Sequence, residues 1–250
     1  MKISIITVTF NSVQTLFDTF RSIQAQDYPN IEYIIVDGQS TDGTLELIQM
    51  NSNIVTKYIS EPDNGIYDAM NKGLRLATGD VIGFLHSDDE YANSQVISTI
   101  ASNFGSTDID ALFADIVYVQ GNERKEVIRK YRSNRFTPAK IEWGWMPAHP
   151  SLFLNKRVYA KYGVFKTDYK IAGDYEFVAR IFHEDTLKYK YLPEVLVNMR
   201  MGGVSTGGIS NSIVLNKEVL RACKENNINT NIFKILSKYP AKLFDSFSRA

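Results

Sequence analysis

The chain has 250 residues, of which 44% are hydrophobic and 22% are charged, so it has the composition of a globular protein with a sizeable core. Lysine and arginine together number 28, as do aspartate and glutamate, which excludes nucleic-acid binding through bulk positive charge. Cys223 is the single cysteine, so a disulfide framework and a cysteine-rich zinc site are excluded. Any anionic ligand must therefore be held by local groups.

The N-terminal third of the sequence alternates between expected strands and expected helices. Short apolar runs rich in Ile, Val and Thr predict strands over residues 2–10, 31–36, 54–59 and 80–85. Helical spacing predicts helices over 44–50, 66–77 and 93–104, and an earlier one that starts from an N-cap at Asn11–Ser12. This alternation predicts an α/β fold with a Rossmann-like, mostly parallel sheet and helices on both faces.

The pattern loosens after residue 104. Strands are expected over 111–119 and 126–132, an aromatic loop and strand over 143–153, and helices over 156–162, 175–182 and 212–225. Glycine pairs at 202–203 and 207–208 indicate a flexible stretch before the last helix.

Polar residues follow three of the expected strands, namely Asn11, Asp37 and Asp88. Ligands of parallel α/β sheets bind beyond the carboxyl ends of the strands, so we expect these residues to lie at one ligand-binding edge. Adjacent carboxylates at Asp88 and Asp89 repel each other unless a cation or water separates them, and Mg²⁺ and Mn²⁺ prefer such oxygen ligands. The alternative interpretation is a solvated acidic turn that caps the next helix.

An ordered series of motifs resembles family 2 glycosyltransferases with the GT-A fold. Thr7–Ser12 and Val36–Thr44 resemble the opening of these enzymes. The match continues in order with Glu61–Gly73, Ala77–Asp80, Phe84–Asp89, Pro147–Phe153 and Ile171–Glu176. The last two blocks look like the acceptor-side motifs of bacterial surface-polysaccharide members. Each motif is weak alone, but the ordered set, spanning residues 3–205, is specific.

The resemblance implies an inverting enzyme that moves a sugar from a nucleotide-diphosphate-sugar to an acceptor hydroxyl in bacterial surface-polysaccharide synthesis. It implies Mn²⁺ or Mg²⁺ at Asp88 and Asp89, and it leaves open which of the two is the principal ligand. His86 stands where many members have the first Asp of this motif, and we expect it to support the site rather than bind the metal. Asp174 would be the general base, because displacement needs a carboxylate to take the hydroxyl proton. N-capping of the following helix is a compatible role for Asp174.

Other roles also follow from the resemblance. The expected donor-binding residues are Thr9, Asn11, Asp37, Asp68, Lys72, Asp88, His149 and Arg200. Asp37 would accept a hydrogen bond from the base, His149 would lie near the phosphates or the acceptor unless it is structural, and Arg200 would meet the diphosphate. Trp143 and Trp145 are candidates to stack on an acceptor sugar, with core packing as the alternative.

The expected organisation has three parts. Residues 1–120 form the nucleotide-sugar-binding half, residues 121–210 form the acceptor-binding half of the same GT-A domain, and residues 211–250 form a helical C-terminal tail. The expected partners are a nucleotide-sugar donor and a saccharide or lipid-linked saccharide acceptor, without nucleic acid.

The tail carries an amphipathic pattern. Its apolar positions are Ile232, Ile235, Leu236, Tyr239, Leu243 and Phe247, and its basic positions are Lys234, Lys238 and Lys242. Such a stretch suits an anionic membrane surface, and packing on the domain's own core is the alternative. Pro240 predicts two short helices instead of one. Without a signal-peptide pattern or a spanning apolar run, the expected location is the cytoplasm, peripherally on the inner face of the plasma membrane.

The sequence bears on three rival functions. Gly203–Gly207 matches the G-x-S-x-G elbow of hydrolases, but all three histidines precede Ser205, which contradicts the triad order of that class. A nucleotidyltransferase would carry a glycine-rich basic loop after the first strand, where this chain has Asn11-Ser12-Val13. A sugar-nucleotide-binding protein without transfer activity remains an alternative.

Overall fold

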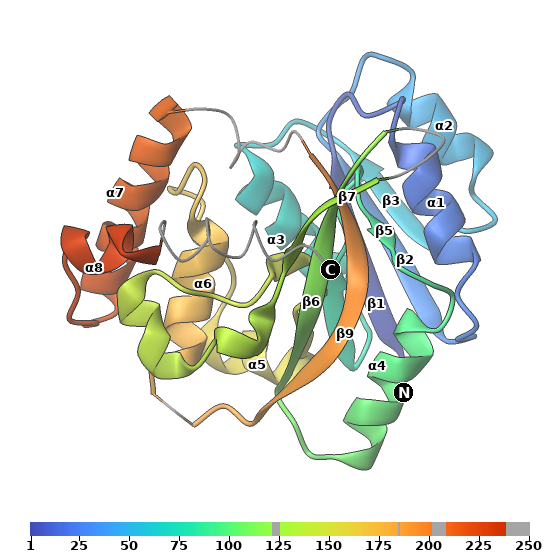
Figure 1. Cartoon of the computed structure of the whole chain (residues 1–250). Helices are drawn as coiled ribbons and strands as arrows, with labels where there is room; N and C mark the ends of the chain where they lie inside the picture. The colour runs from blue at the N-terminus through green and yellow to red at the C-terminus, as the bar shows by residue number, and fades with distance from the viewer. Residues whose placement is uncertain (122–125, 185, 202–208, 239–250) are drawn as a thin grey trace.

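The computed structural model describes residues 1–121, 126–184, 186–201 and 209–238. Within this part, one sheet of nine strands has the order β3-β2-β1-β4-β8-β6-β9-β5, with β7 paired to β6 (Figure 1). The strands are β1 (Ile3–Thr9), β2 (Ile31–Asp37), β3 (Lys57–Ser60), β4 (Val81–Phe84), β5 (Glu90–Tyr91), β6 (Ala111–Gln120), β7 (Glu126–Tyr131), β8 (Phe153–Asn155) and β9 (Tyr189–Arg200). The α-helices are α1 (Leu16–Gln24), α2 (Thr44–Met50), α3 (Ile66–Leu76), α4 (Val96–Ser106), α5 (Lys156–Tyr162), α6 (Gly173–Phe182), α7 (Ile209–Glu225) and α8 (Ile232–Leu236). Three short 3₁₀ helices are η1 (Ser133–Arg135), η2 (Pro138–Trp143) and η3 (His149–Ser151).

Strands β3, β2, β1 and β4 form the parallel half of the sheet. Every residue of β1 is buried, because a parallel strand is covered on both faces, and this explains its continuous apolar run. Ile3 and Ile5 belong to the core that includes α1 and α4, whereas Ile6 and Val8 belong to the core that includes α3 and α6. The predicted α/β fold with helices on both faces is confirmed.

Strand β9 was not predicted from the sequence, although it runs through the second half of the sheet beside β6. Ala114 of β6 pairs with Leu192, but Asp115 pairs with Val195, so Pro193 and Glu194 form a bulge. A proline has no N–H for a strand ladder and is tolerated at such a bulge. Pro193 therefore argues against a strand in the sequence, although the bulge accommodates it in the structure.

The first helix begins later than expected. The carbonyl of Ser12 accepts bonds from the amides of Thr15 and Leu16, so residues 12–15 form a turn and Thr15 is the N-cap of α1. The Ser12 hydroxyl accepts a hydrogen bond from Ser87 Oγ at 3.0 Å instead of capping the helix. The expected cap therefore ties two loops together at the carboxyl edge of the sheet.

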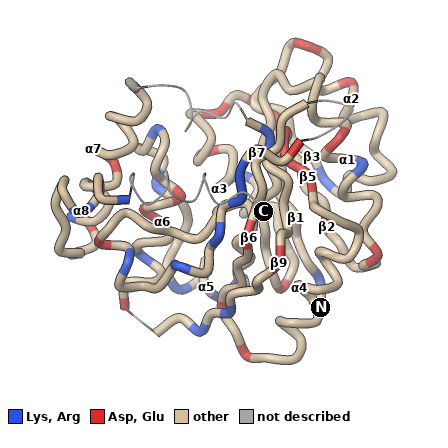
Figure 2. Tube along the Cα trace, in the orientation of Figure 1, with Lys and Arg blue, Asp and Glu red and all other residues tan. Residues whose placement is uncertain are grey.

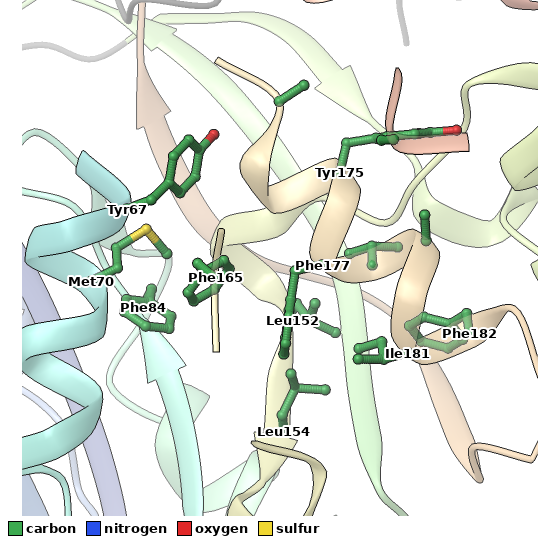
Figure 3. Packing of buried hydrophobic residues seen from close by; sticks show 14 of the residues in the cluster. Tyr67, Met70, Phe84, Leu152, Leu154, Phe165, Tyr175, Phe177, Ile181 and Phe182 are labelled. Carbon is green, nitrogen blue, oxygen red and sulfur yellow. The ribbon is translucent and has the colours of Figure 1, made fainter. Parts of the chain in front are cut away.

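An aromatic core fixes α6 against α3. Figure 3 shows Tyr67 of α3 and Phe165 between the two helices, with Phe177 of α6 beyond them. The ring centroids of Tyr67 and Phe165 are 6.1 Å apart, and those of Phe165 and Phe177 are 4.7 Å apart. A Cβ at Gly173 would lie 2.7 Å from the Tyr67 ring, so this approach requires glycine at the first residue of α6.

The C-terminal helices pack beside α6 and η2, away from α1 and α2 (Figure 1). Ile235 is fully buried in the core, as the core-packing alternative requires, whereas Phe233 is 82% exposed. Tyr239, Pro240, Lys242, Leu243 and Phe247 of the expected amphipathic stretch lie outside the described residues. In the part of the chain that the structure describes, no helix is both long and apolar enough to cross a membrane.

Candidate active site

A cleft with a volume of about 510 Å³ lies where the parallel strands end. Thr9 at the end of β1, the segment His86–Asp89 after β4, and the first turn of α3 line it. His149 of η3 and Asp174 of α6 complete its wall. The cleft therefore joins the end of the parallel sheet to the second half of the molecule, at the edge expected for a ligand.

Asp88 and Asp89 both line the cleft, but they differ in burial. Asp89 is fully buried, which contradicts a solvated acidic turn at this position, whereas Asp88 is partly exposed. The Asp89 amide donates to the His86 carbonyl, and the Thr19 hydroxyl donates to the Asp89 carbonyl at 2.8 Å. These two bonds draw Asp89 inward beneath the loop that follows β4.

The Asp89 carboxylate has an unused oxygen. Its Oδ1 accepts the Arg200 amide at 3.3 Å, but its Oδ2 has no hydrogen-bond partner among the described residues. Burial, with the charge of Asp88 second, raises the pKa of Asp89 well above its usual range. A buried carboxylate oxygen without a partner is costly unless a cation or proton compensates it, so Oδ2 fits a divalent cation.

Protein side chains supply only part of a cation's coordination shell here. Among the residues that the structure describes, no cluster of three or more His, Cys, Asp or Glu side chains is arranged to hold a metal ion. Mg²⁺ and Mn²⁺ commonly take one or two carboxylates and complete their shell with water and substrate phosphates. Asp88 and Asp89 fit that pattern, since together they provide carboxylates within the cleft.

Two histidines that line the cleft stack on each other. The ring centroids of His86 and His149 are 5.8 Å apart and the rings are nearly parallel, and Phe84 also stacks with His149 at 5.9 Å. Burial lowers the pKa of each histidine to about 4, and for His86 the neighbouring His149 adds to the effect. Both rings are therefore neutral at pH 7, so they offer hydrogen bonds to a ligand but no positive charge.

Asp174 lies in the first turn of α6 and borders the cleft. The helix begins at Gly173 with Ala172 as its N-cap, so Asp174 is not the cap that the sequence suggested. Its Oδ1 accepts the Tyr175 amide at 2.8 Å and lies 3.4 Å from the Tyr67 hydroxyl. Burial outweighs these hydrogen bonds and raises the pKa of Asp174 to about 6.

The expected donor-binding residues occupy different positions around the cleft. Thr9 lines it, and the Thr9 hydroxyl has no partner among the described residues. Asn11 accepts the Thr41 amide at 2.9 Å and so joins the two loops that follow β1 and β2. Arg200 extends from β9 next to cleft-lining Met199, with its guanidinium 2.9 Å from Asp18 Oδ2.

Asp37 has a different environment from the one expected. Its side chain is fully buried and accepts bonds from the Ser40 amide and from the hydroxyls of Ser40 and Ser60. The described residues that border the cleft do not include it. The structure therefore shows Asp37 holding the loop after β2, and its contact with a nucleotide base stays a prediction.

Asp68 and Lys72 support the loop before α3. Lys72 lies 2.9 Å from Glu61 Oε1 and donates to the Pro62 carbonyl, and Asp68 accepts the Asn64 amide at 3.1 Å. That loop contributes Asp63 and Gly65 to the cleft. Both residues thus shape the cleft wall.

The tryptophans lie elsewhere. Trp143 is 39% exposed, its indole N–H donates to Glu142 Oε1 at 2.7 Å, and Lys234 Nζ lies 5.3 Å from its ring. Neither Trp143 nor Trp145 is among the described residues that line the cleft. Their contact with an acceptor stays a prediction that this cleft does not support.

Two residues of the cleft wall were missed by sequence reasoning. Tyr67 and Asp63 both line the cleft and lie within the Glu61–Gly73 motif, from which only Asp68 and Lys72 were chosen. Asp63 accepts the Gly65 amide at 2.8 Å. The motif itself was the available signal, since it covers the loop and first turn of α3.

The comparisons with known proteins agree with this geometry. Residues 4–163 match the family described as Glycosyl transferase family 2, and the chain belongs to that family and is a glycosyltransferase. An uncharacterised glycosyltransferase of Mycobacterium tuberculosis (strain CDC 1551 / Oshkosh) is 31% identical over 181 residues, covering 71% of this chain and 68% of the relative. A "PGL/p-HBAD biosynthesis glycosyltransferase" of Mycobacterium bovis (strain BCG / Pasteur 1173P2) is 28% identical over 222 residues, covering 87% and 82%.

Solved structures identify the fold. S. aureus TarS (residues 1–349) in complex with UDP-GlcNAc superposes with a TM-score of 0.71 at 21% identity, covering 100% of this chain and 74% of TarS. The mannosyltransferase PcManGT from Pyrobaculum calidifontis, in complex with GDP-Man and Mn²⁺, gives a TM-score of 0.65 at 16% identity and covers 100% and 76%. The expected GT-A fold is confirmed.

Proposed function

We propose that this chain is an inverting glycosyltransferase that moves a sugar from a nucleotide-diphosphate-sugar to an acceptor hydroxyl. One observation carries the proposal: a carboxylate with a pKa near 6, Asp174, and an acidic pair, Asp88 and Asp89, line the same cleft. The first suits proton transfer near neutral pH, and the second suits the charge of a diphosphate held with a cation.

The reaction is a single displacement at the anomeric carbon. Asp174 takes the proton of the acceptor hydroxyl as its oxygen bonds to that carbon, and the bond to the diphosphate breaks on the opposite side. The deprotonated fraction of Asp174 is large at pH 7 because its pKa is about 6. A pKa closer to neutrality also makes it a stronger base than an exposed aspartate.

The proposed cofactor is Mn²⁺ or Mg²⁺, held by Asp88 and Asp89. When bound, the cation neutralises the diphosphate and stabilises the charge of the leaving group. The neutral histidines and Thr9 offer hydrogen bonds without adding charge. The Mn²⁺ named with PcManGT supports this choice.

The proposed donors are sugars linked to UDP, GDP or dTDP, and the proposed acceptor is a saccharide or lipid-linked saccharide of a bacterial surface polymer or glycolipid. TarS is described with UDP-GlcNAc and PcManGT with GDP-Man, which supports a nucleotide-sugar. The relative named for PGL biosynthesis supports the acceptor class. The proposed location is the cytoplasm, at the inner face of the plasma membrane.

A nucleotide-sugar panel tests the function. With Mn²⁺ present, sugars of one nucleotide at about 100 times their Kd should stabilise the fold by about 2.7 kcal/mol and raise Tm by several degrees. The same donor should slowly release nucleoside diphosphate, measured by a coupled assay. Stabilisation without release, even with acceptors present, would identify a sugar-nucleotide-binding protein. Release of pyrophosphate from a nucleoside triphosphate and a sugar phosphate would identify a nucleotidyltransferase.

We also propose that α8 touches an anionic membrane surface. Phe233 is 82% exposed, Leu236 43% and Ile232 38%, so one short helix presents three apolar side chains to solvent. Trp143, 39% exposed, adjoins them through Lys234. Lys, Arg, Asp and Glu are scattered over the whole trace, the region of α8 included (Figure 2), so the exposed apolar side chains of α8 support the proposed contact with lipid.

Replacing Phe233→Ser together with Leu236→Ser should weaken binding to phosphatidylglycerol vesicles at least about tenfold, because these side chains would otherwise enter the interface. The measurement is co-sedimentation of the full chain with vesicles. Met50→Ser is the control, since Met50 is 80% exposed on α2 and should leave binding unchanged. Equal binding by the double variant would refute the membrane contact.

A further inference from the structure

The segment that precedes the proposed base is held by a carboxylate from a distant helix. Glu218 of α7 accepts three consecutive backbone amides: Lys170 N at 2.7 Å on Oε1, and Ile171 N and Ala172 N at 2.9 and 2.8 Å on Oε2. Hydrogen bonds to a charged acceptor are about twice as strong as neutral ones. Glu218 thus fixes the backbone that leads into α6.

The same segment is held from the other side by Tyr67 of α3. The Tyr67 hydroxyl donates to the Ile171 carbonyl at 2.6 Å and lies 3.4 Å from Asp174 Oδ1. Tyr67 is 5% exposed, and its ring packs against Gly173 without room for a Cβ. Figure 3 shows Tyr67 extending from α3 toward the start of α6.

The contacts of Glu218 and Tyr67 hold a segment that borders the cleft. Lys170, Ile171 and Asp174 all line the cleft, whereas Glu218 is not among the described residues that border it. Glu218 therefore acts on the cleft through the backbone it holds. Tyr67 reaches the same backbone from α3.

We propose that Glu218 and Tyr67 are positioning residues that clamp residues 170–174 between α7 and α3, and so set the place of the Asp174 carboxylate in the cleft. The inference rests on the proposed role of Asp174 as the base. Displacing a reacting group by about 1 Å can reduce a rate about 100-fold, so a clamp of this kind affects catalysis without touching substrate.

The two clamp residues also act on the charge of Asp174 in opposite directions. The negative charge of Glu218 raises the pKa of Asp174, whereas the Tyr67 hydroxyl lowers it. Glu218 faces Asp174 from α7, Tyr67 from α3 and Tyr131 from β7, and the cleft adds Asp63, Asp88, His86, His149 and Lys170. These other groups are unchanged in a single variant. The direction in which the pKa of Asp174 shifts therefore reports the effect of the residue replaced.

Glu218→Gln should lower kcat by about 10- to 100-fold while the donor KM stays within about twofold, because the base is displaced but the donor site is intact. Tyr67→Phe, which keeps the ring against Gly173, should also lower kcat by about tenfold. The acid limb of the kcat–pH profile should move to lower pH in Glu218→Gln and to higher pH in Tyr67→Phe. A merely structural role would not produce opposite shifts.

The control is Glu225→Gln on the same helix. Glu225 binds side chains of Lys166, Tyr169 and Arg221, and the hydrogen bonds that the structure records for its carboxylate involve no amide of residues 170–172. Its kcat and acid limb should match those of the native protein. Unchanged kcat and unchanged acid limbs in both clamp variants would overturn the inference. If Glu218→Gln fails to fold, the kcat and the acid limb of Tyr67→Phe alone test the inference.

Hydrogen exchange separates this inference from the proposed function. In Glu218→Gln the amides of residues 170–172 should exchange at least about tenfold faster than in Glu225→Gln, whether or not the protein transfers sugar. Equal exchange in the two variants would overturn the clamp. An active native protein whose Asp174→Asn variant is equally active would overturn the assignment of the base, and a native protein inactive on every nucleotide-sugar would overturn the proposed function.

Discussion

Asp174→Asn should reduce sugar transfer by about 10²- to 10⁴-fold while leaving donor affinity close to that of the native protein. The amide keeps the shape of the carboxylate, and its oxygen still accepts the Tyr175 amide, but it does not take a proton from the acceptor. The measurements are kcat for transfer and calorimetric Kd for the donor. Asp168→Asn is a matched control, because Asp168 precedes α6 and pairs with Arg221 at the surface.

The pH dependence of kcat should also report the ionisation of Asp174. A base with a pKa of about 6 is ionised above that pH, so kcat should be highest above about pH 7 and fall as pH drops through 6. The folded pKa is raised from 3.8, so the ionised carboxylate opposes folding at neutral pH. Asp174→Asn should therefore raise Tm by a few degrees at pH 8, and this gain should vanish below about pH 4.

Transfer by Asp174→Asn within a few-fold of the native rate would place the base elsewhere. Glu176, the other acidic residue in the first turn of α6, is fully buried and paired with Lys166 and Arg180. It stabilises α6 and is not placed to meet an acceptor, so another residue of the cleft would have to serve.

The parallel half of the fold could be predicted because the burial of each strand is visible in its own short stretch of sequence. A strand covered on both faces must be apolar throughout, as β1 is, and the polar residues that follow such strands must collect at one edge. The ends of β1 and β4 carry Thr9 and the segment leading to Asp88, and these do line one cleft. Local sequence patterns are sufficient to predict an element where burial alone determines its residues.

The second half depends on contacts that no local pattern shows. Pro193 argues against a strand unless its partner β6 supplies a bulge, and that bulge appears only when both strands are seen together. Likewise, Glu218 belongs to no sequence motif. It accepts the amides of Lys170, Ile171 and Ala172 from a separate helix, and a local pattern does not show such a contact. The burial of Asp89 follows from Thr19, which belongs to α1. Long-range pairing of this kind lies beyond sequence periodicity.

Asp89→Asn should remove cation binding and reduce turnover at least about 100-fold, because the charge of a developing diphosphate would lose a stabilisation of several kcal/mol. The sequence left open which acid dominates, and the structure favours Asp89, whose Oδ2 is buried without a partner among the described residues. Asp88→Asn, altering a partly exposed carboxylate, should have a smaller effect on both properties.

The measurement with Mn²⁺ has a readout that does not require catalysis. Titrating Mn²⁺ should raise Tm of the native protein and of Asp88→Asn, but not of Asp89→Asn. The amide is uncharged and less costly to bury than a carboxylate, so Asp89→Asn should be folded and at least as stable without metal. Glu90→Gln is the control, since Glu90 follows in the chain but lines a separate hollow beside Arg21 and Asn93. Full Mn²⁺ stabilisation and full turnover in Asp89→Asn would exclude this carboxylate as the cation ligand and leave Asp88 to carry the charge of the diphosphate.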